Sequence, residues 1–161
     1  MVIKLSIDKV KLYLQQFNRE NDVLEFGSSS ATVELAAQAL NVIPARIAKT
    51  IALKREDGCI LIVAAGDARI DNVKFRAEYN VKAKMLSHDD VERLVGHSVG
   101  GVCPFAINAG VPVYLDISLK RFESVFPACG SASSAIELSC SELYEYAQAQ
   151  GWVDVCKDWE A

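Results

Sequence analysis

Residues 96–105 (GHSVGGVCPF) have the composition of a rigid loop that can present its backbone to a ligand. The adjacent Gly100 and Gly101 let the chain turn sharply and approach a ligand without an intervening side chain. Pro104 fixes its own φ angle and restricts the residue before it, which stiffens the turn. Main-chain amides exposed in such a turn can donate hydrogen bonds to a reacting carbonyl or to a phosphate. The loop is therefore either a plain tight turn or part of a binding site.

Lys49 is a charged residue inside an apolar segment, residues 47–51 (IAKTI). The pattern alone fits a lysine on the solvent face of a half-buried strand. In a binding site, the same ammonium would supply a compact positive charge for a terminal phosphate or a developing oxyanion. The neighbouring Thr50 points to the opposite face of a regular strand, so only a bulge or a strand end would bring both residues to one site.

Cys103, next to Pro104, raises the question of a cysteine nucleophile, because the thiolate is the reactive form of cysteine. A catalytic cysteine needs a nearby base and a lowered pKa. His97 lies six residues away, and nothing in the sequence shows that the two side chains meet. We therefore expect Cys103 to line a pocket wall, with a buried inert thiol as the alternative.

Four short segments stand in a definite order along the chain. They are SSATVELAA at 29–37, RIAKT at 46–50, the glycine loop, and CGS at 129–131 followed by IEL at 136–138. In this order and at these distances they resemble the YbaK/EbsC family of aminoacyl-tRNA deacylases, which includes the editing domain of bacterial prolyl-tRNA synthetases. The resemblance runs from about Val10 to Tyr146. It implies a curled mixed β-sheet or barrel with surrounding helices.

The same resemblance implies roles for individual residues. Lys49 stands where the family carries its functional lysine, and the glycine loop would hold the ester carbonyl and the terminal ribose, with Gly101 as the key amide. We take Lys49 and Gly101 as the catalytic residues. Phe26 is either a ligand contact or a core residue, and Pro104 supports the wall. The expected substrate-binding residues are Phe26, Thr50, Gly100, Val102, Cys103, Pro104, Gly130 and Ser131.

The chain departs from the cysteinyl-tRNA deacylase branch of that family beyond residue 129. In that branch we expect Gly-Gly followed by basic residues, and an aspartate just before Ile-Glu-Leu. This sequence has Gly130 and Ser131 with no basic residue, and Ala135 before the Ile-Glu-Leu at 136–138. The substrate choice of that branch therefore cannot be carried over.

Composition limits the other possibilities. The net charge of −4 argues against a general DNA- or RNA-binding protein, although a local basic patch could still hold the end of a tRNA. Five cysteines, without CxxC spacing, indicate reduced thiols rather than a disulfide framework. With only two histidines, nothing resembles a zinc site, so we expect neither metal nor cofactor. No apolar run is long enough for a transmembrane helix, and we expect a cytoplasmic protein with no membrane partner.

Hydrophobic periodicity and capping residues predict an irregular alternation of helices and strands. Helices are expected over 7–17, from Ser30 or Thr32 to about Asn41, from Asp71 or Asn72 to about Tyr79, from Ser87 to about Gly96, and from Ser139 to Gln150. Strands are expected over 22–26, 47–54, 59–65, 82–86, 111–116, 124–128 and 135–138. Because a strict βαβ repeat is missing, the chain fits a mixed α+β fold, which we expect to form one domain over residues 1–161.

These observations predict a free-standing, metal-independent hydrolase that removes small amino acids from mischarged tRNA, with tRNA(Pro) as the expected carrier. Its partners would be the acceptor end of aminoacyl-tRNA and, transiently, a tRNA synthetase. The alternative is a non-catalytic tRNA-end-binding or regulatory module with the same pocket. A nucleotide-binding enzyme is disfavoured, since the chain lacks both GxxxxGK[ST] and GxGxxG. The amino acid removed and the oligomeric state stay open.

Overall fold

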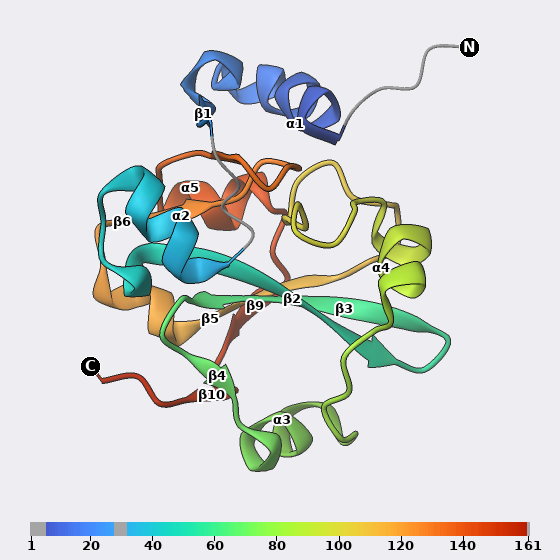
Figure 1. Ribbon diagram of the computed structural model, residues 1–161. Coiled ribbons are helices and arrows are strands. Elements are labelled where there is room, and N and C mark those ends of the chain that lie inside the picture. The colour runs from blue at the N-terminus through green and yellow to red at the C-terminus, as the bar shows by residue number, and fades with distance from the viewer. Residues whose placement is uncertain (1–5, 28–31, 161) are drawn as a thin grey trace.

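The protein is built around a six-stranded mixed sheet with the strand order β8-β6-β2-β3-β5-β9 (Figure 1). The structure, a computed structural model, describes residues 6–27 and 32–160. The strands of this sheet are β2 (Ile47–Arg55), β3 (Gly58–Ala65), β5 (Val113–Asp116), β6 (Ser124–Pro127), β8 (Leu138–Ser139) and β9 (Gly151–Val153). The sheet is curled but not closed, because β8 and β9 form its two edges. This mixed, curled sheet with surrounding helices confirms the predicted fold class.

The β2–β3 hairpin forms the centre of the sheet. The two strands pair antiparallel from Ala48 opposite Ala65 to Arg55 opposite Gly58, which leaves a turn of two residues. Glu56 takes the left-handed conformation that such a turn requires (φ 51°). The apolar run of β3 is buried along nearly its whole length, as expected for a strand covered on both faces. The predicted hairpin is thus confirmed.

Parallel pairing extends the hairpin on both sides. β5 lies parallel to β3, and β9 lies parallel to β5, while β6 lies parallel to β2 and pairs antiparallel with β8. Two short antiparallel ladders stand outside this sheet. They are β1 (Leu24–Glu25) with β7 (Ser134–Ala135), and β4 (Arg69–Ile70) with β10 (Cys156–Lys157).

Four helices begin at capping residues that the sequence predicts. Thr32, Asp71, Ser87 and Ser139 each accept a hydrogen bond from the first turn of a helix, and Ser139 forms a full capping box with Glu142. Ser30, the other candidate cap of α2, lies outside the described residues. The helices are α1 (Ser6–Leu14), α2 (Val33–Leu40), α3 (Asn72–Tyr79), α4 (His88–Val95) and α5 (Cys140–Tyr146), with 3-10 turns η1 (Gln15–Phe17), η2 (Glu20–Asp22), η3 (Pro44–Arg46) and η4 (Ile117–Arg121).

Three predicted elements differ in the structure. Residues 82–86 form no strand but a single bridge, Met85 to Leu53, and the Met85 side chain is 65% exposed, so no second strand encloses it. The predicted strand 135–138 is split into β7 and β8, which pair with different strands. The last helix ends at Tyr146 rather than Gln150, because Gly151 begins β9, which pairs with β5.

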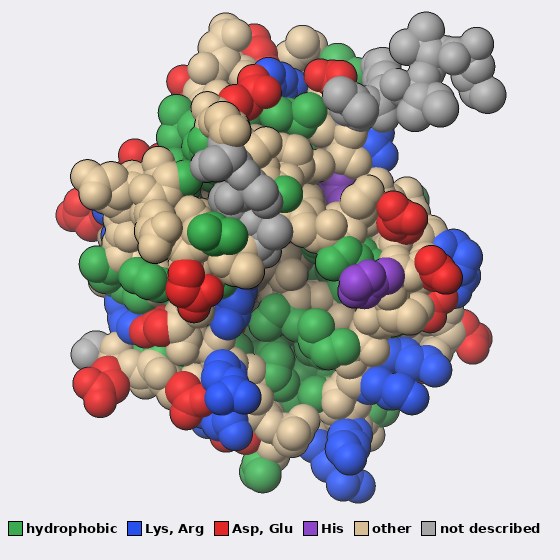
Figure 2. All heavy atoms as spheres, in the orientation of Figure 1, with side chains coloured by type: hydrophobic (Ala, Val, Ile, Leu, Met, Phe, Trp, Pro, Cys, Tyr) green, Lys and Arg blue, Asp and Glu red, His purple; other side chains and the backbone are tan. Residues whose placement is uncertain are grey.

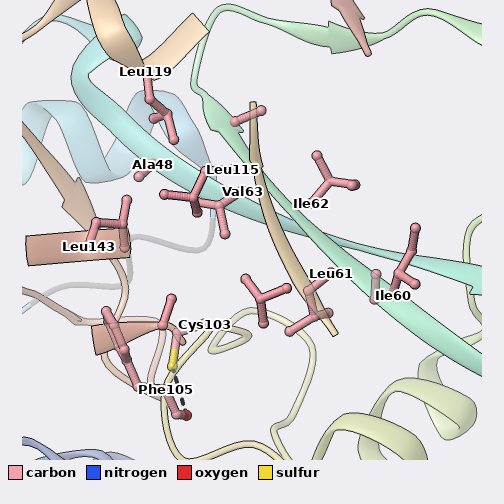
Figure 3. Close-up of a cluster of buried hydrophobic side chains, with 14 of the residues drawn as sticks. Ala48, Ile60, Leu61, Ile62, Val63, Cys103, Phe105, Leu115, Leu119 and Leu143 are labelled. Carbon is pink, nitrogen blue, oxygen red and sulfur yellow. Dashed lines mark hydrogen bonds between the residues drawn. The ribbon is translucent and has the colours of Figure 1, made fainter. Parts of the chain in front are cut away.

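Two apolar clusters fill the space around the sheet. The larger one packs the inner face of β2, β3 and β5 against α1, α4, α5 and the glycine loop, and Figure 3 shows part of it, including Val63, Leu115 and Leu143. The smaller one joins Ala37 of α2 to Ile47 and Phe126 of the sheet. Because α2 covers only this end of β2, the strand leaves the cluster after Ile47, and the candidate site begins there. Within residues 6–27 and 32–160, no helix has the length and hydropathy that crossing a membrane requires.

Candidate active site

The site lies at an unpaired stretch of the edge of β2. On that edge β6 pairs only with Ile47 and Ala48. Farther along the same edge, the Lys54 N–H donates to the Lys84 carbonyl and the Ala52 carbonyl accepts from the Leu86 N–H. Between these two contacts, no described strand pairs with the edge at Thr50.

The hydrogen-bond pattern of the hairpin fixes what this edge presents. In an antiparallel pair, successive residues point their N–H and C=O groups alternately toward and away from the partner strand. Ala52 and Lys54 bond outward, away from β3. By the same alternation Thr50 points its N–H and C=O outward, into the gap. Lys49 and Thr50 therefore reach one pocket without a bulge, from the two faces of a strand whose edge is open.

A cavity of about 170 Å³ occupies this gap. One wall is apolar and comes from α2, β2 and β6. The facing wall comes from the glycine loop and from residues 128–135, and it is made of small and hydroxyl side chains. The lining residues are Thr32, Val33, Ala36, Leu40, Ile47, Ala48, Lys49, Thr50, Gly100, Val102, Phe126, Ala128, Ser131, Ser134 and Ala135.

Lys49 is the cationic side chain of this lining. Its Nζ donates a hydrogen bond to the Gly66 carbonyl at 3.3 Å, and among the described residues it makes no salt bridge. The pKa of this ammonium is lowered, mainly by burial, because the charged form loses contact with water in the wall of the cavity. The result is a donor that is anchored on one side and has further N–H groups to offer to a ligand.

The glycine loop shows why its two glycines are needed, and the reasons differ. Gly100 has a φ of +98° and lines the cavity. Gly101 does not line it, and its N–H donates to the Ser98 carbonyl at 3.0 Å. A Cβ on Gly101 would lie 2.7 Å from the Gly130 carbonyl oxygen, closer than real Cβ contacts. Gly101 therefore shapes the loop by close backbone packing, while its amide is engaged within the loop.

Cys103 faces the core and not the cavity. It has no exposed surface, and its thiol reaches the Phe105 carbonyl at 3.6 Å (Figure 3). Burial is the main cause that raises its pKa to about 12. His97 Nε2 lies 3.5 Å from the sulfur but 2.7 Å from the same Phe105 carbonyl, which places its proton on Nε2. Because a general base must accept through a free lone pair, this nitrogen cannot deprotonate Cys103.

The remaining predicted site residues divide into those at the cavity and those behind it. Ser131 lines the cavity, and its hydroxyl lies 2.7 Å from that of Ser134. Gly130 packs against α1, where an added Cβ would lie 2.7 Å from the Ser6 carbonyl oxygen. Pro104 lines a separate hollow on another side of the loop. Phe26 packs against the smaller apolar cluster and donates its N–H to the Ser133 carbonyl at 2.9 Å.

Sequence reasoning missed the apolar wall of the cavity. On α2 this wall consists of Val33, Ala36 and Leu40, which are three and four residues apart and so lie on one helix face. Phe126 of β6 completes it. The sequence shows the helical spacing of these α2 residues. It does not show that this helix face is turned toward the gap beside β2.

Figure 2 shows one face of the molecule, on which basic side chains stand beside acidic ones, and the described residues of this face form no continuous basic surface. At the cavity itself, a ligand would meet the local positive charge of Lys49. The part of the chain that the structure describes contains no group of three or more His, Cys, Asp or Glu side chains arranged to hold a metal.

Comparison with known proteins agrees with this fold and identifies its family. Residues 28–146 match the family described as the aminoacyl-tRNA editing domain. The chain belongs to this family, as the order of its four segments predicted.

Relatives extend the match to nearly the whole chain. YwhH, an uncharacterized protein of Bacillus subtilis (strain 168), is 55% identical over 157 residues, which cover 97% of this chain and 100% of YwhH. The proline–tRNA ligase of Bacillus pumilus (strain SAFR-032) is 27% identical over 102 residues, which are 63% of this chain and 18% of the ligase. A crystal structure described as a candidate trans-editing enzyme for prolyl-tRNA synthetase superposes with a TM-score of 0.86 at 26% identity, over 97% of this chain and 99% of that one.

Proposed function

We propose that this protein is a trans-editing deacylase that hydrolyses the ester between a small amino acid and tRNA, with tRNA(Pro) as its carrier and without a metal. The observation that carries the proposal is the convergence of Lys49, Thr50 and Gly100 on one cavity in a chain of the editing-domain family. The relation to a proline–tRNA ligase and to a candidate trans-editing enzyme supports the choice of carrier.

In this proposal the aminoacyl ester lies along the open edge of β2. The Lys49 ammonium and the outward Thr50 N–H supply hydrogen-bond donors for the ester carbonyl or a phosphate of the terminal nucleotide, and they strengthen as negative charge develops on oxygen. Gly100 and Val102 hold the opposite side, and Gly101 keeps the loop in shape. Donors fixed in place before the reaction need no reorganisation as it proceeds.

The reaction needs no acyl-enzyme intermediate. Water attacks the ester carbonyl carbon, the carbon–oxygen bond to the ribose breaks, and the ribose oxygen takes up a proton. The products are a free amino acid and a tRNA with a free terminal hydroxyl. Cys103 takes no part, because its buried thiol has a raised pKa and does not line the cavity.

The size of the cavity supports a small side chain. The wall formed by Val33, Leu40 and Phe126 is apolar and offers no charge to a charged amino acid. Such a wall excludes large side chains by steric overlap. Between two substrates that differ by one methylene group, it provides only about 1–3 kcal/mol of discrimination. We therefore propose that alanyl, seryl and cysteinyl esters all react and that the prolyl ester is spared.

The wider setting follows from this function. We propose that residues 1–161 act as one editing domain in the cytoplasm, where charged tRNA is used. The domain would bind the acceptor end of aminoacyl-tRNA and meet a tRNA synthetase only transiently. The net charge of −4, with Lys49 as the cationic residue of the cavity lining, supports brief contact with the tRNA end instead of extended binding along the tRNA.

A panel of charged tRNAs tests the proposal. The purified protein is mixed in excess with alanyl-, seryl-, cysteinyl- and prolyl-tRNA(Pro), and the charged fraction is followed over time. We expect fast loss of the small amino acids and survival of prolyl-tRNA. Rapid hydrolysis of prolyl-tRNA would contradict the proposal, and tight binding without turnover would favour the alternative of a non-catalytic binding module.

A further inference from the structure

The turn that receives the Lys49 ammonium is held by an ion pair behind it. Lys49 Nζ donates to the carbonyl of Gly66, and Asp67 is the next residue in the turn. Arg121 of η4 binds the Asp67 carboxylate with two nitrogens, at 2.6 and 2.9 Å. A bidentate arrangement fixes both the position and the orientation of the carboxylate.

The turn itself has little freedom to move. A Cβ on Gly66 would lie 2.1 Å from the Pro44 carbonyl oxygen, so this residue is pressed against η3. The Ala68 N–H donates to the Ala65 carbonyl at 2.9 Å and closes the turn. The Gly66 carbonyl, which accepts from Lys49, therefore belongs to a tightly packed turn that also carries Asp67.

Arg121 is in turn fixed by the C-terminal segment. Its Cζ lies 4.9 Å from the ring centre of Phe122 and 5.0 Å from that of Trp159. Its Nε donates to the Ser118 carbonyl at 2.9 Å, and its Nη1 to the Glu160 carbonyl at 3.2 Å. A guanidinium held in this way, with 15% of its side chain exposed, loses little entropy when it binds the carboxylate.

Four groups from different parts of the fold act on the charge of Lys49, and Asp67 is the one that Arg121 holds by a bidentate ion pair. The Cys156 thiol of β10 is uncharged at neutral pH. Its burial, with a smaller effect of the nearby Asp116, raises its pKa to about 12. Arg69 of β4 opposes a positive charge on Lys49, and Glu34 of α2 supports it. Glu34 makes no salt bridge among the described residues, whereas Asp67 is held by Arg121. The hydrogen bond from Arg121 is the main cause of the lowered pKa of the Asp67 carboxyl group.

We propose that Asp67 and Arg121 are a positioning pair for the catalytic lysine: Arg121 fixes the Asp67 carboxylate, which keeps the Lys49 ammonium charged and aimed into the cavity. The proposal rests on the function assigned above to Lys49. Neither residue lines the cavity. Through Trp159 and Glu160, the pair also makes the C-terminal segment part of the support of the active site.

The direct test is the pKa of Lys49 itself, measured by NMR on protein with carbon-13 in its lysine side chains. Lys49→Met identifies the signal. We expect Asp67→Asn to lower the pKa of Lys49 by roughly half a unit or more, because a nearby negative charge favours the ammonium. Asp154→Asn is the matched control, since Asp154 pairs with Lys74 at 3.0 Å and is not among the main charges that act on Lys49. An unchanged pKa in Asp67→Asn overturns the proposal.

A second variant covers the case in which Asp67→Asn folds poorly because it leaves Arg121 unpaired. The double variant Asp67→Asn/Arg121→Gln removes both charges together, so that neither partner of this partly buried pair is left without its counter-charge. We expect the Lys49 pKa in this variant to lie below that of the single variant Arg121→Gln, because that comparison removes the Asp67 charge alone. Equal Lys49 pKa values in the double variant and in Arg121→Gln would again overturn the proposal.

The pH dependence of hydrolysis tests the link to catalysis. With charged Lys49 as the active form, activity falls as the pH rises through its pKa, after subtraction of spontaneous ester hydrolysis. In Asp67→Asn this alkaline fall should move to lower pH by the same amount as the NMR titration. An NMR shift without a matching shift in activity would overturn the catalytic role of the pair. A wild type that hydrolyses no charged tRNA would overturn the proposed function instead, while the NMR result would still decide whether Asp67 acts on Lys49.

Discussion

At the scale of single residues, the site depends on one half-buried ammonium. Lys49 Nζ donates to the Gly66 carbonyl, and the residue lines the cavity. We expect Lys49→Ala to lower deacylation by about 10²- to 10³-fold, the usual effect of removing one transition-state donor. Single-turnover hydrolysis measures the loss. Lys54→Ala, at an exposed position of the same strand, should keep wild-type activity, and an active Lys49→Ala protein would show that this lysine is not catalytic.

The residue scale also distinguishes the glycines. We expect Gly101→Ala to destabilise the fold by about 1–3 kcal/mol, since an added methyl group must displace the Gly130 backbone. Its activity should fall as well, because Gly100 moves with the loop. The matched control is Gly58→Ala, where an added Cβ meets nothing within 4 Å. Urea denaturation of both variants compares their free energies of unfolding, and equal stabilities would contradict the close packing at Gly101.

At the scale of elements, α2 sets the size of the cavity. Ala36 faces the cavity, whereas Ala39, on the same helix, is exposed to solvent. Ala36→Leu should therefore fill part of the cavity of about 170 Å³ and abolish hydrolysis of alanyl-tRNA, while Ala39→Leu leaves it unchanged. The two variants make the same chemical change on one helix, so rates and melting curves measured together separate filling of the cavity from loss of folding. Full activity of Ala36→Leu would remove α2 from the substrate site.

At the scale of the whole molecule, stability should depend on one buried histidine between pH 7 and 5. Burial is the main cause that lowers the pKa of His97 in the folded chain, whereas in the unfolded chain it is about 6.5. Below that pH the unfolded state binds more protons, so the free energy of unfolding falls as the pH falls, by at most about 1.4 kcal/mol per pH unit. The lowered carboxyl pKa values of Asp67 and Glu142 act only at lower pH, near and below about 4.

Urea denaturation at pH 7, 6 and 5 measures this dependence. His97→Gln should flatten the decline, since a glutamine amide can donate to the Phe105 carbonyl without titrating. His88→Gln, at the first position of α4, is the control and should retain the wild-type slope. The same slope in His97→Gln and in the wild type would show that another group is responsible.

A further test at this scale concerns metals. We expect full deacylase activity after exhaustive dialysis against a chelator, because the proposed reaction uses only Lys49 and main-chain donors. Hydrolysis of alanyl-tRNA is measured before and after dialysis. Loss of activity that a single divalent metal restores would contradict the metal-independent reaction.

The sequence by itself determined the local structure and the family. The β2–β3 hairpin, the caps Thr32, Asp71, Ser87 and Ser139, and the mixed fold class were all predictable, because periodicity and capping depend on residues close together in the chain. The family followed from the order of four segments and agrees with the match over residues 28–146.

Only the tertiary structure decided which groups face the cavity. Gly100 and Gly101 look equivalent in sequence, yet Gly101 packs against residue 130, almost thirty positions away. Lys49 and Thr50 share one cavity because β6 leaves β2 after Ala48, and β9 exists as a strand because β5 is there to pair with it. Pairing and close approach between distant segments carry no local signal, so the open edge of β2, and with it the candidate site, appears only when the chain is folded.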